Sequence, residues 1–188
     1  MENVSSSTLI VILLVVVAVL GAVWFFLQKK RTETLKSQFG PEYDRATKQH
    51  GNVGRAESEL EKRAQRVAKF KIIELSPADR ERFVNAWQED QAKFVDSPKG
   101  AVIDADRIVT EVMKTRGYPM GEFEQMAADI SVDHPAVVEN YRSAHLIATR
   151  NERGEANTED LRKAMVHYRA LFEDLLGTNT TQATEARR

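Results

Sequence analysis

The sequence predicts an all-α protein in which a single transmembrane helix precedes a helical domain. Residues 9–27 form an uninterrupted apolar run that carries no charge. Residues 76–176 repeat their apolar side chains at intervals of three and four, the spacing of one face of a helix. No segment alternates apolar and polar residues as a half-buried strand would. We therefore expect a membrane span, a helical stalk, and a compact bundle of four main helices plus one short helix.

The apolar run has the length of a membrane span. Its nineteen residues, at about 1.5 Å each, make a helix of roughly 28 Å, close to the thickness of the bilayer's hydrocarbon layer. Fifteen of them are Leu, Ile, Val or Phe, which favours insertion by about 4–9 kcal/mol. A core helix rarely stays apolar on all sides for this length. A cleaved signal peptide would have a basic start and a shorter run, whereas residues 1–8 carry only Glu2.

Basic residues predict the orientation of the span. No Lys or Arg precedes it, and several follow it closely. Positive charge stays on the cytoplasmic side, so we expect residues 1–8 outside the cell and the rest of the chain inside. Trp24 suits the inner head-group region. The residues that we assign to the membrane interface are Trp24, Lys29, Lys30, Arg31 and Lys36.

Residues 28–75 are predicted to form a basic juxtamembrane stalk. Residues 29–75 hold twelve Lys and Arg against seven Asp and Glu, whereas residues 76–188 hold fifteen against twenty. Each cation beside an anionic leaflet is worth about 1 kcal/mol, so a lipid-surface sensor is one interpretation. A simple stop-transfer cluster is the interpretation that we favour. Ala18 and Ala22 form a small-xxx-small pair, which leaves a weak homo-oligomer open.

Helix start and stop signals divide the rest of the chain. Gly40 and Pro41 are expected to end the first helix at about residue 38. Ser76 and Thr158 are expected N-caps, and Asp133 is expected to cap a helix that Pro135 opens. The predicted helices cover residues 41–49, 55–70, 77–95, 98–116, 121–130, 135–149 and 158–176. The bundle domain is then residues 76–176, and residues 177–188 are predicted to be a disordered tail.

No recognisable catalytic motif occurs in the chain. It lacks the Gly-rich phosphate and dinucleotide fingerprints, the H-E-x-x-H zinc motif and the paired Glu-x-x-His of di-iron bundles. The absence of cysteine excludes disulfides and thiol nucleophiles. We therefore predict no cofactor, no metal site and no enzymatic activity. The acidic balance of residues 76–188 also argues against nucleic-acid binding, which needs clustered cations.

Two histidines are the candidate catalytic residues if the protein is an enzyme after all. His145 and His167 lie on the last two predicted helices, and both would approach Glu139 or Asp174 if those helices pack antiparallel. This interpretation describes an enzyme that acts at the membrane leaflet. We favour ordinary packing for His145 and solvent exposure for His167, because a site needs convergent polar groups in a pocket.

Three aromatic residues are the candidate partner-binding surface. Phe83, Trp87 and Phe94 share one face of the helix predicted at residues 77–95. They would line an apolar groove for a partner helix. Aromatic residues at this spacing more often belong to a core, and we favour that alternative.

Four segments resemble a family of uncharacterised bacterial proteins with one amino-terminal membrane span and a charged helical region. They are FGPEYDR (39–45), QAKFVDSPKGAV (91–102), SVDHPAVVENYRSAH (131–145) and TEDLRKAMVHYRALFEDLL (158–176). The resemblance implies a bacterial host, and hence the inner membrane, and a stable helical domain. It implies no activity and no site residue. With the span, it leads us to expect a membrane-anchored adaptor or scaffold that binds a protein partner, which the sequence does not identify.

Overall fold

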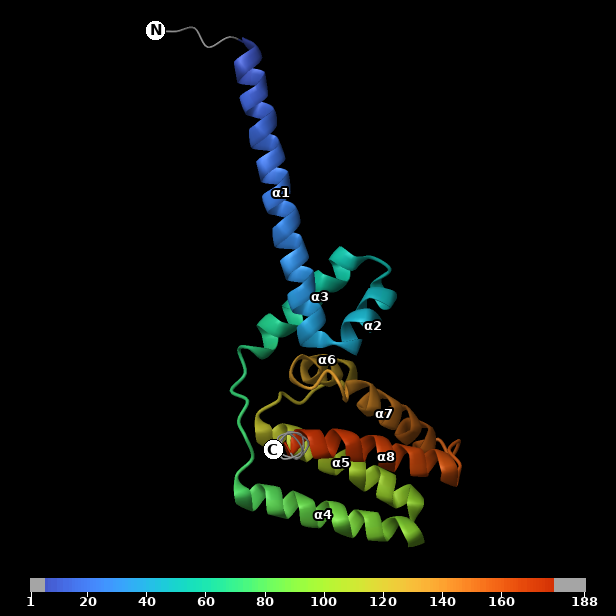
Figure 1. The fold of residues 1–188 in the computed structure, drawn as a ribbon. Helices are drawn as coiled ribbons and strands as arrows, with labels where there is room; N and C mark the ends of the chain where they lie inside the picture. Colours follow the sequence, from blue (N-terminus) through green and yellow to red (C-terminus); the bar gives the residue numbers. More distant parts are fainter. Residues whose placement is uncertain (1–5, 178–188) are drawn as a thin grey trace, which may run out of the picture. The chain divides into compact units, whose positions relative to one another are not determined.

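The computed structural model describes residues 6–177, and within them every regular element is an α-helix (Figure 1). This confirms the predicted all-α fold with an apolar helix at the amino terminus. The predicted tail beyond Gly177 and the first five residues lie outside the described part. The helices are α1 (Ser6–Phe39), α2 (Pro41–His50), α3 (Val53–Val67), α4 (Pro77–Asp96), α5 (Pro98–Arg116), α6 (Phe123–Asp133), α7 (Val138–Glu152) and α8 (Thr158–Leu175).

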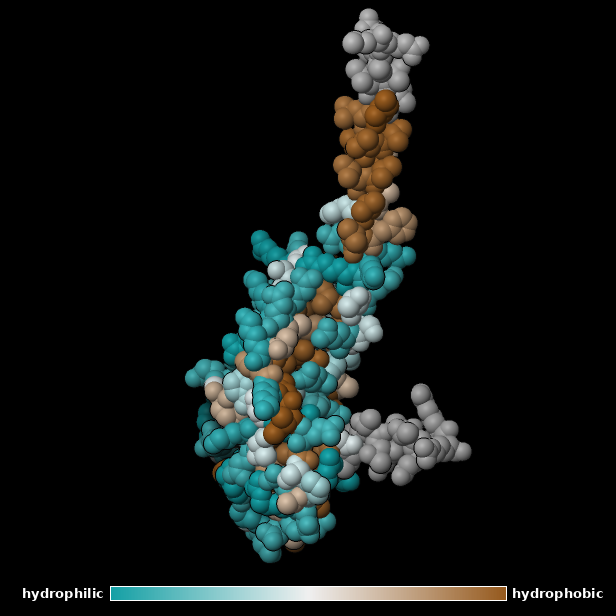
Figure 2. Space-filling view, turned by 90° about the vertical axis from the view of Figure 1, so that its left-hand side faces the viewer, coloured by the Kyte–Doolittle hydropathy of each residue, from teal (hydrophilic) through white to brown (hydrophobic). Residues whose placement is uncertain are grey.

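The chain divides into two compact units, Met1–Gln38 and Phe39–Arg188. The first unit contains the helix that is long and apolar enough to cross a membrane. Its large side chains from Ile12 to Leu27 are between 48% and 68% exposed, on every side of the helix. Figure 2 shows the result as a continuous hydrophobic surface along this helix. A helix that is apolar all round suits a lipid environment rather than one face of a water-soluble core.

The boundary between the two units, after residue 38, falls within the predicted stalk of residues 28–75. Residues 28–75 span both units, because α2 and α3 belong to the second unit together with the bundle. Helix α3 packs against α2 and against α6. Its buried side chains include Leu60 and Arg63. Residues 39–67 are therefore a packed helical hairpin, which we call the α2–α3 hairpin.

Local capping explains where several helices begin. The Ser76 side chain accepts a hydrogen bond from the Asp79 N–H at 3.1 Å, and Pro77 occupies the first turn of α4. The cap of α8 is Asn157 rather than the predicted Thr158, since the Asn157 side chain accepts from the Asp160 N–H at 2.9 Å. The Asp160 carboxylate accepts from the Asn157 N–H in return, which completes a capping box.

Helix α7 begins later than predicted. Pro135 was expected to open it, but residues 135–137 form a turn and α7 starts at Val138. The His134 carbonyl accepts hydrogen bonds from the N–H groups of both Val137 and Val138, each at 3.2 Å. Asp133 is also no cap for α7. It ends α6, and its carboxylate accepts the Tyr118 hydroxyl at 2.7 Å.

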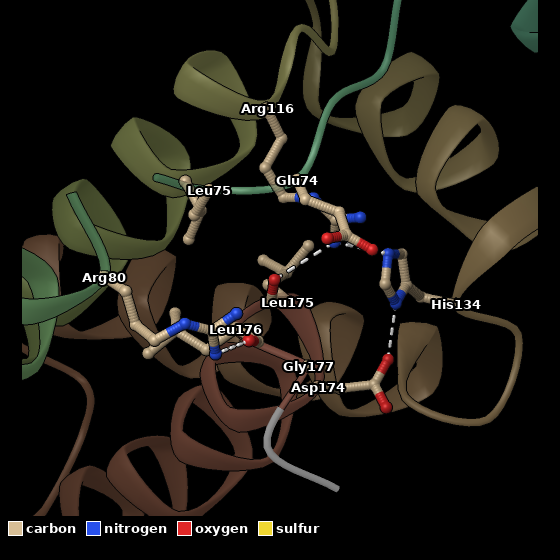
Figure 3. A pocket seen from close by; sticks show the side chains of 9 residues that line it. All are labelled: Glu74, Leu75, Arg80, Arg116, His134, Asp174, Leu175, Leu176 and Gly177. Carbon is tan, nitrogen blue, oxygen red and sulfur yellow. Dashed lines mark hydrogen bonds and ion pairs between the residues drawn. The ribbon is translucent and has the colours of Figure 1, made fainter. Parts of the chain in front are cut away.

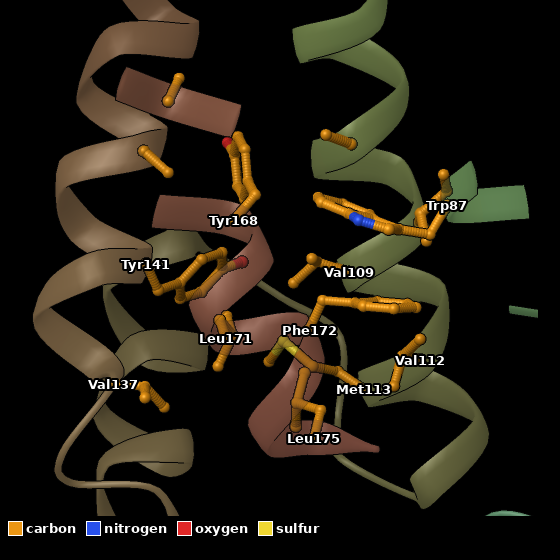
Figure 4. Close-up of a cluster of buried hydrophobic side chains, with 14 of the residues drawn as sticks. Trp87, Val109, Val112, Met113, Val137, Tyr141, Tyr168, Leu171, Phe172 and Leu175 are labelled. Carbon is orange, nitrogen blue, oxygen red and sulfur yellow. The ribbon is translucent and has the colours of Figure 1, made fainter. Parts of the chain in front are cut away.

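The hydrophobic core lies between α4, α5, α7 and α8, and Ala127 and Ile130 of α6 also contribute to it (Figure 4). Helix α8 packs against both α7 and α5, and α5 also packs against α4. Trp87 of α4 stacks on Phe172 of α8, with 4.7 Å between ring centroids and 16° between ring planes. Tyr168 is fully buried, and its hydroxyl donates to Asp106 of α5 at 2.7 Å. The stripe of α8 that the sequence predicts is thus the centre of the core.

The segment between α3 and α4 lies across the end of α5. The Ile73 N–H donates to the Arg116 carbonyl at 2.9 Å. Gly117 ends α5 with φ of 97°, a backbone conformation that favours glycine. A Cβ at this position would lie 2.4 Å from the Lys71 carbonyl oxygen. Glycine is therefore required at position 117, both for its positive φ and because a Cβ would collide with the Lys71 carbonyl. This close approach of Lys71 to Gly117 fixes residues 71–75 beside the ends of α5 and α8.

Candidate functional site: a polar pocket at the end of α8

A polar pocket opens where five segments of the second unit meet (Figure 3). Its volume is about 420 Å³, within the range of small-ligand sites. Segment 71–75, the start of α4, the end of α5, the residue after α6 and the end of α8 each contribute to it. The lining residues are Glu74, Leu75, Arg80, Arg116, His134, Asp174, Leu175, Leu176 and Gly177.

Arg116 connects three of these segments. Its Nη1 donates to the Leu175 carbonyl at 3.1 Å, and its Nε donates to the Ile73 carbonyl at 3.4 Å. The same Nη1 lies 3.0 Å from Nε2 of His134. Arg80 donates to the next carbonyl of α8, that of Leu176. The two guanidiniums thus satisfy backbone carbonyls that the end of a helix leaves without partners.

The contacts of His134 define its tautomer. A guanidinium has only donors, so Nε2 of His134 must accept from Arg116. The ring proton then resides on Nδ1, which donates to the Asp174 carboxylate at 2.5 Å. Both ring nitrogens of His134 are therefore engaged, and Nε2 is already occupied by Arg116. The pair resembles a base and its orienting carboxylate, but the ring nitrogen that would take a proton faces a cation.

A buried phenol lies beside the same histidine. Tyr118 is 3% exposed, and its ring centroid is 6.4 Å from that of His134. Burial and the hydrogen bond to Asp133 raise the pKa of the Tyr118 hydroxyl well above its usual range. Tyr118 therefore stays protonated and acts as a hydrogen-bond donor that fixes the turn after α6.

The two histidines that the sequence singled out have different partners in the structure. His145 stacks on Phe123 with 3.7 Å between ring centroids, and its Nδ1 lies 3.9 Å from Asp106. His167 has another partner, since its Nδ1 lies 2.8 Å from the Asn140 side-chain oxygen. The two carboxylates proposed for them are engaged elsewhere: Glu139 lies 3.5 Å from Arg142, and Asp174 contacts His134. The contacts do not assemble the predicted catalytic group.

The predicted aromatic groove is part of the core. Phe83 is 1% exposed and Trp87 is 5% exposed. Phe94 is partly buried and packs against the same core. These side chains cannot form an open groove, so the structure corrects that interpretation in favour of the core alternative.

The predicted membrane-interface residues lie on α1. The Trp24 side chain is exposed, and the Lys29 ammonium lies 3.9 Å from Glu33 one turn further along the helix. Lys30 accepts a hydrogen bond from Thr34 through its carbonyl oxygen at 2.9 Å. Arg31 and Lys36 also have interaction partners. The assignment of these residues to the membrane interface stays a prediction.

The residues of the pocket gave no sequence signal as a group. Arg80, Arg116, His134 and Asp174 come from four different segments and have no common spacing. His134 lies between Asp133 and Pro135, which the sequence predicted only as a cap and a helix start. Within residues 6–177, no cluster of three or more His, Asp or Glu side chains is placed to hold a metal ion. No protein family, no curated protein and no solved structure matches this chain.

Proposed function

We propose that this protein is a membrane-tethered adaptor. Helix α1 spans the bilayer once, and the domain of residues 39–177 holds a protein partner at the membrane surface. The observation that carries the proposal is the pairing of a helix that is apolar on every side with a compact domain that keeps a polar pocket at its surface. The pocket is the surface that we assign to the partner.

The tether itself supplies the mechanism. A partner that also resides at the membrane meets the domain at a raised effective concentration, without any further contact. The helical domain supplies a rigid scaffold, because its core fixes the segments that line the pocket. A binding site on rigid elements keeps its geometry while the partner arrives and leaves.

We also propose the bacterial inner membrane, with the amino terminus outside and the domain in the cytoplasm. Support comes from the cations that follow the span and are missing before it. Reporter fusions to the carboxyl terminus of the full chain test this orientation. A cytoplasmic fluorescent reporter should be active and an alkaline phosphatase reporter inactive. The reverse result would overturn the orientation.

Site-specific photo-cross-linking in cells tests the adaptor function. A photoreactive residue replaces Glu74, which is exposed at the rim of the pocket. The control position is Val95, which is 83% exposed on α4. It lies about 22 Å along the helix from Arg80. We expect a discrete protein adduct from position 74 and none from position 95. Equal adduct patterns at both positions, or none at either, would contradict the proposal.

A further inference from the structure

Arg80 and Arg116 differ from most other arginines of the domain. Nearly every arginine between residues 39 and 177 lies within 4 Å of a carboxylate oxygen of Asp or Glu: Arg45, Arg63, Arg66, Arg82, Arg107, Arg142, Arg150, Arg153, Arg162 and Arg169. Arg80 and Arg116 instead contact neutral acceptors, namely backbone carbonyls and the His134 ring. Arg55 is the remaining arginine of this range with no such ion pair. Two cations without a carboxylate partner therefore line one pocket.

Each of the two guanidiniums keeps donors for a ligand. Arg116 uses Nε and Nη1, and Arg80 uses Nη1, in the contacts among the described residues. A guanidinium carries five N–H donors, so each residue retains donors on Nη2. Figure 3 shows the two guanidiniums on either side of the carbonyl groups at the end of α8. Those carbonyls carry only partial negative charge, which does not neutralise two full positive charges.

The two acidic residues of the pocket, Glu74 and Asp174, form no ion pair with either arginine among the described residues. The Asp174 carboxylate is turned to Nδ1 of His134. Glu74 is exposed to solvent at the rim and has no ion pair with either arginine. A surface carboxylate that makes no direct contact is screened by water and salt, so it competes weakly with a ligand that is held by several N–H groups.

We propose that this pocket binds an oxyanion, a carboxylate or a phosphate, between Arg80 and Arg116. The planar guanidinium fork matches both groups and holds them through paired charge-assisted hydrogen bonds. This inference rests on the proposed adaptor function, and it names the chemical group by which the partner is recognised. The source of the group is an acidic side chain, a carboxyl terminus or a phosphate ester.

Direct titration with simple anions tests the site. The full chain, in lipid nanodiscs and with ¹⁵N-labelled arginine, is titrated with acetate and with inorganic phosphate, at an ionic strength kept constant with chloride. We expect saturable shifts of the Arg80 and Arg116 side-chain signals with at least one of the two anions, and not with chloride alone. The ratio of the two affinities distinguishes a carboxylate source from a phosphate source. Shifts no larger than those of chloride would overturn the proposal.

Two substitutions in the pocket should change its affinity for the anion in opposite directions. Arg80→Gln keeps an N–H donor for the Leu176 carbonyl but removes the charge, and should weaken anion binding by about tenfold. Glu74→Gln removes the acid at the rim and should tighten binding by about twofold to fivefold. Glu74 is exposed, so this variant does not endanger the fold. Arg55→Gln on α3 is the control and should leave the affinity unchanged. Equal affinities in all three variants would contradict the site.

The anion titration and the cross-linking experiment can each give a negative result independently of the other. Anion binding without a partner adduct from position 74 would support the pocket and contradict the adaptor function. A partner adduct without anion binding would support the adaptor function and contradict oxyanion recognition.

Discussion

The bundle has one large hydrophobic core, whereas the α2–α3 hairpin combines a smaller set of buried apolar side chains, among them Phe39, Tyr43 and Leu60, with buried ionic contacts to α6 and α7. The main hydrophobic core draws its buried residues from positions 75 to 176 only, and it contains none from α2 or α3. The hairpin contacts α7 through a buried carboxylate, Glu42, whose side chain is 1% exposed. Glu42 accepts two hydrogen bonds from Arg142 of α7, at 2.8 and 2.9 Å, and one from Arg63 of α3, at 2.9 Å.

Apolar burial and buried ion pairs contribute differently: the first mainly stabilises the bundle, and the second mainly fixes the position of the hairpin. Apolar burial stabilises the bundle in proportion to area and tolerates small shifts. A buried ion pair gains little net free energy, because both charges lose their hydration, but removing one partner leaves an unpaired buried charge. Arg66 adds a second ionic contact, 3.0 Å from the buried carboxylate of Asp129 on α6. The hairpin should therefore be placed accurately but should open more easily than the bundle.

The largest expected effect comes from truncating the centre of the core. Phe172→Ala removes a ring that is 3% exposed and stacked on Trp87. We expect a loss of about 3–5 kcal/mol in the free energy of unfolding. Denaturant titration of the full chain in detergent, followed by Trp fluorescence, measures it. The control is Val166→Ala on the same helix, at a side chain that is 54% exposed, and it should change stability by less than about 0.5 kcal/mol.

A smaller and more local effect is expected from the ionic attachment. Glu42→Gln leaves Arg63 and Arg142 buried without their shared carboxylate and should destabilise the hairpin by about 3 kcal/mol. Hydrogen exchange of the full chain should accelerate in α2 and α3 and stay unchanged in α8. Faster exchange in both regions would show that the hairpin and the bundle open as one unit, which would contradict separate opening of the hairpin.

The same substitution at an exposed partner of Arg63 is the matched control. Glu59 lies 3.4 Å from Arg63, and its side chain is 39% exposed. An ion pair at such a position contributes at most about 1 kcal/mol. Glu59→Gln should therefore leave the exchange of α2 and α3 nearly unchanged.

The difference between local apolar spacing and long-range ion pairs explains which helices and contacts the sequence could predict. Apolar side chains at helical spacing, together with a Ser–Pro start, predicted α4, α5 and α8 nearly as they are, because these signals are local. Residues 39–67 fall within the predicted basic stalk, and their apolar spacing is interrupted by Arg63. In the structure Arg63 is buried and paired with Glu42, twenty-one residues earlier in the chain. A long-range ion pair leaves no periodic pattern, so the packing of the hairpin could not be predicted.

The candidate site was even harder to predict from the sequence than the packing of the hairpin. Arg80 and Arg116 were ordinary charged residues on predicted helices, and His134 was part of a turn. They meet because the segment at residues 71–75 crosses the end of α5 at Gly117. The crossing depends on tertiary packing, whereas the glycine was predicted only as a helix end. The sequence therefore predicted the helix boundaries to within about three residues, and it did not predict the contacts between helix ends.

The bundle also contains a buried carboxylate, and its substitution is expected to give the smallest effect on the free energy of unfolding. Asp90 of α4 is 5% exposed, and its two carboxylate oxygens are buried without a hydrogen-bond partner among the described residues. Burial, with a smaller contribution from the nearby Asp104, raises the pKa of Asp90 to about 7. The unfolded chain has the ordinary lower value, so the folded state binds an extra proton between these values and stability falls as pH rises from about 4 to about 7.

Asp90→Asn should remove this dependence, because it replaces the carboxyl with a neutral group of the same size. We expect the stability advantage of the variant over the natural chain to grow by about 2–3 kcal/mol between pH 5 and pH 8. Denaturant midpoints measured from pH 5 to pH 8 test this, with the exposed Asp96→Asn as the control. Parallel pH profiles for the natural chain and Asp90→Asn would show that water reaches this carboxylate, and that the seam between α4 and α5 is looser than the rest of the core.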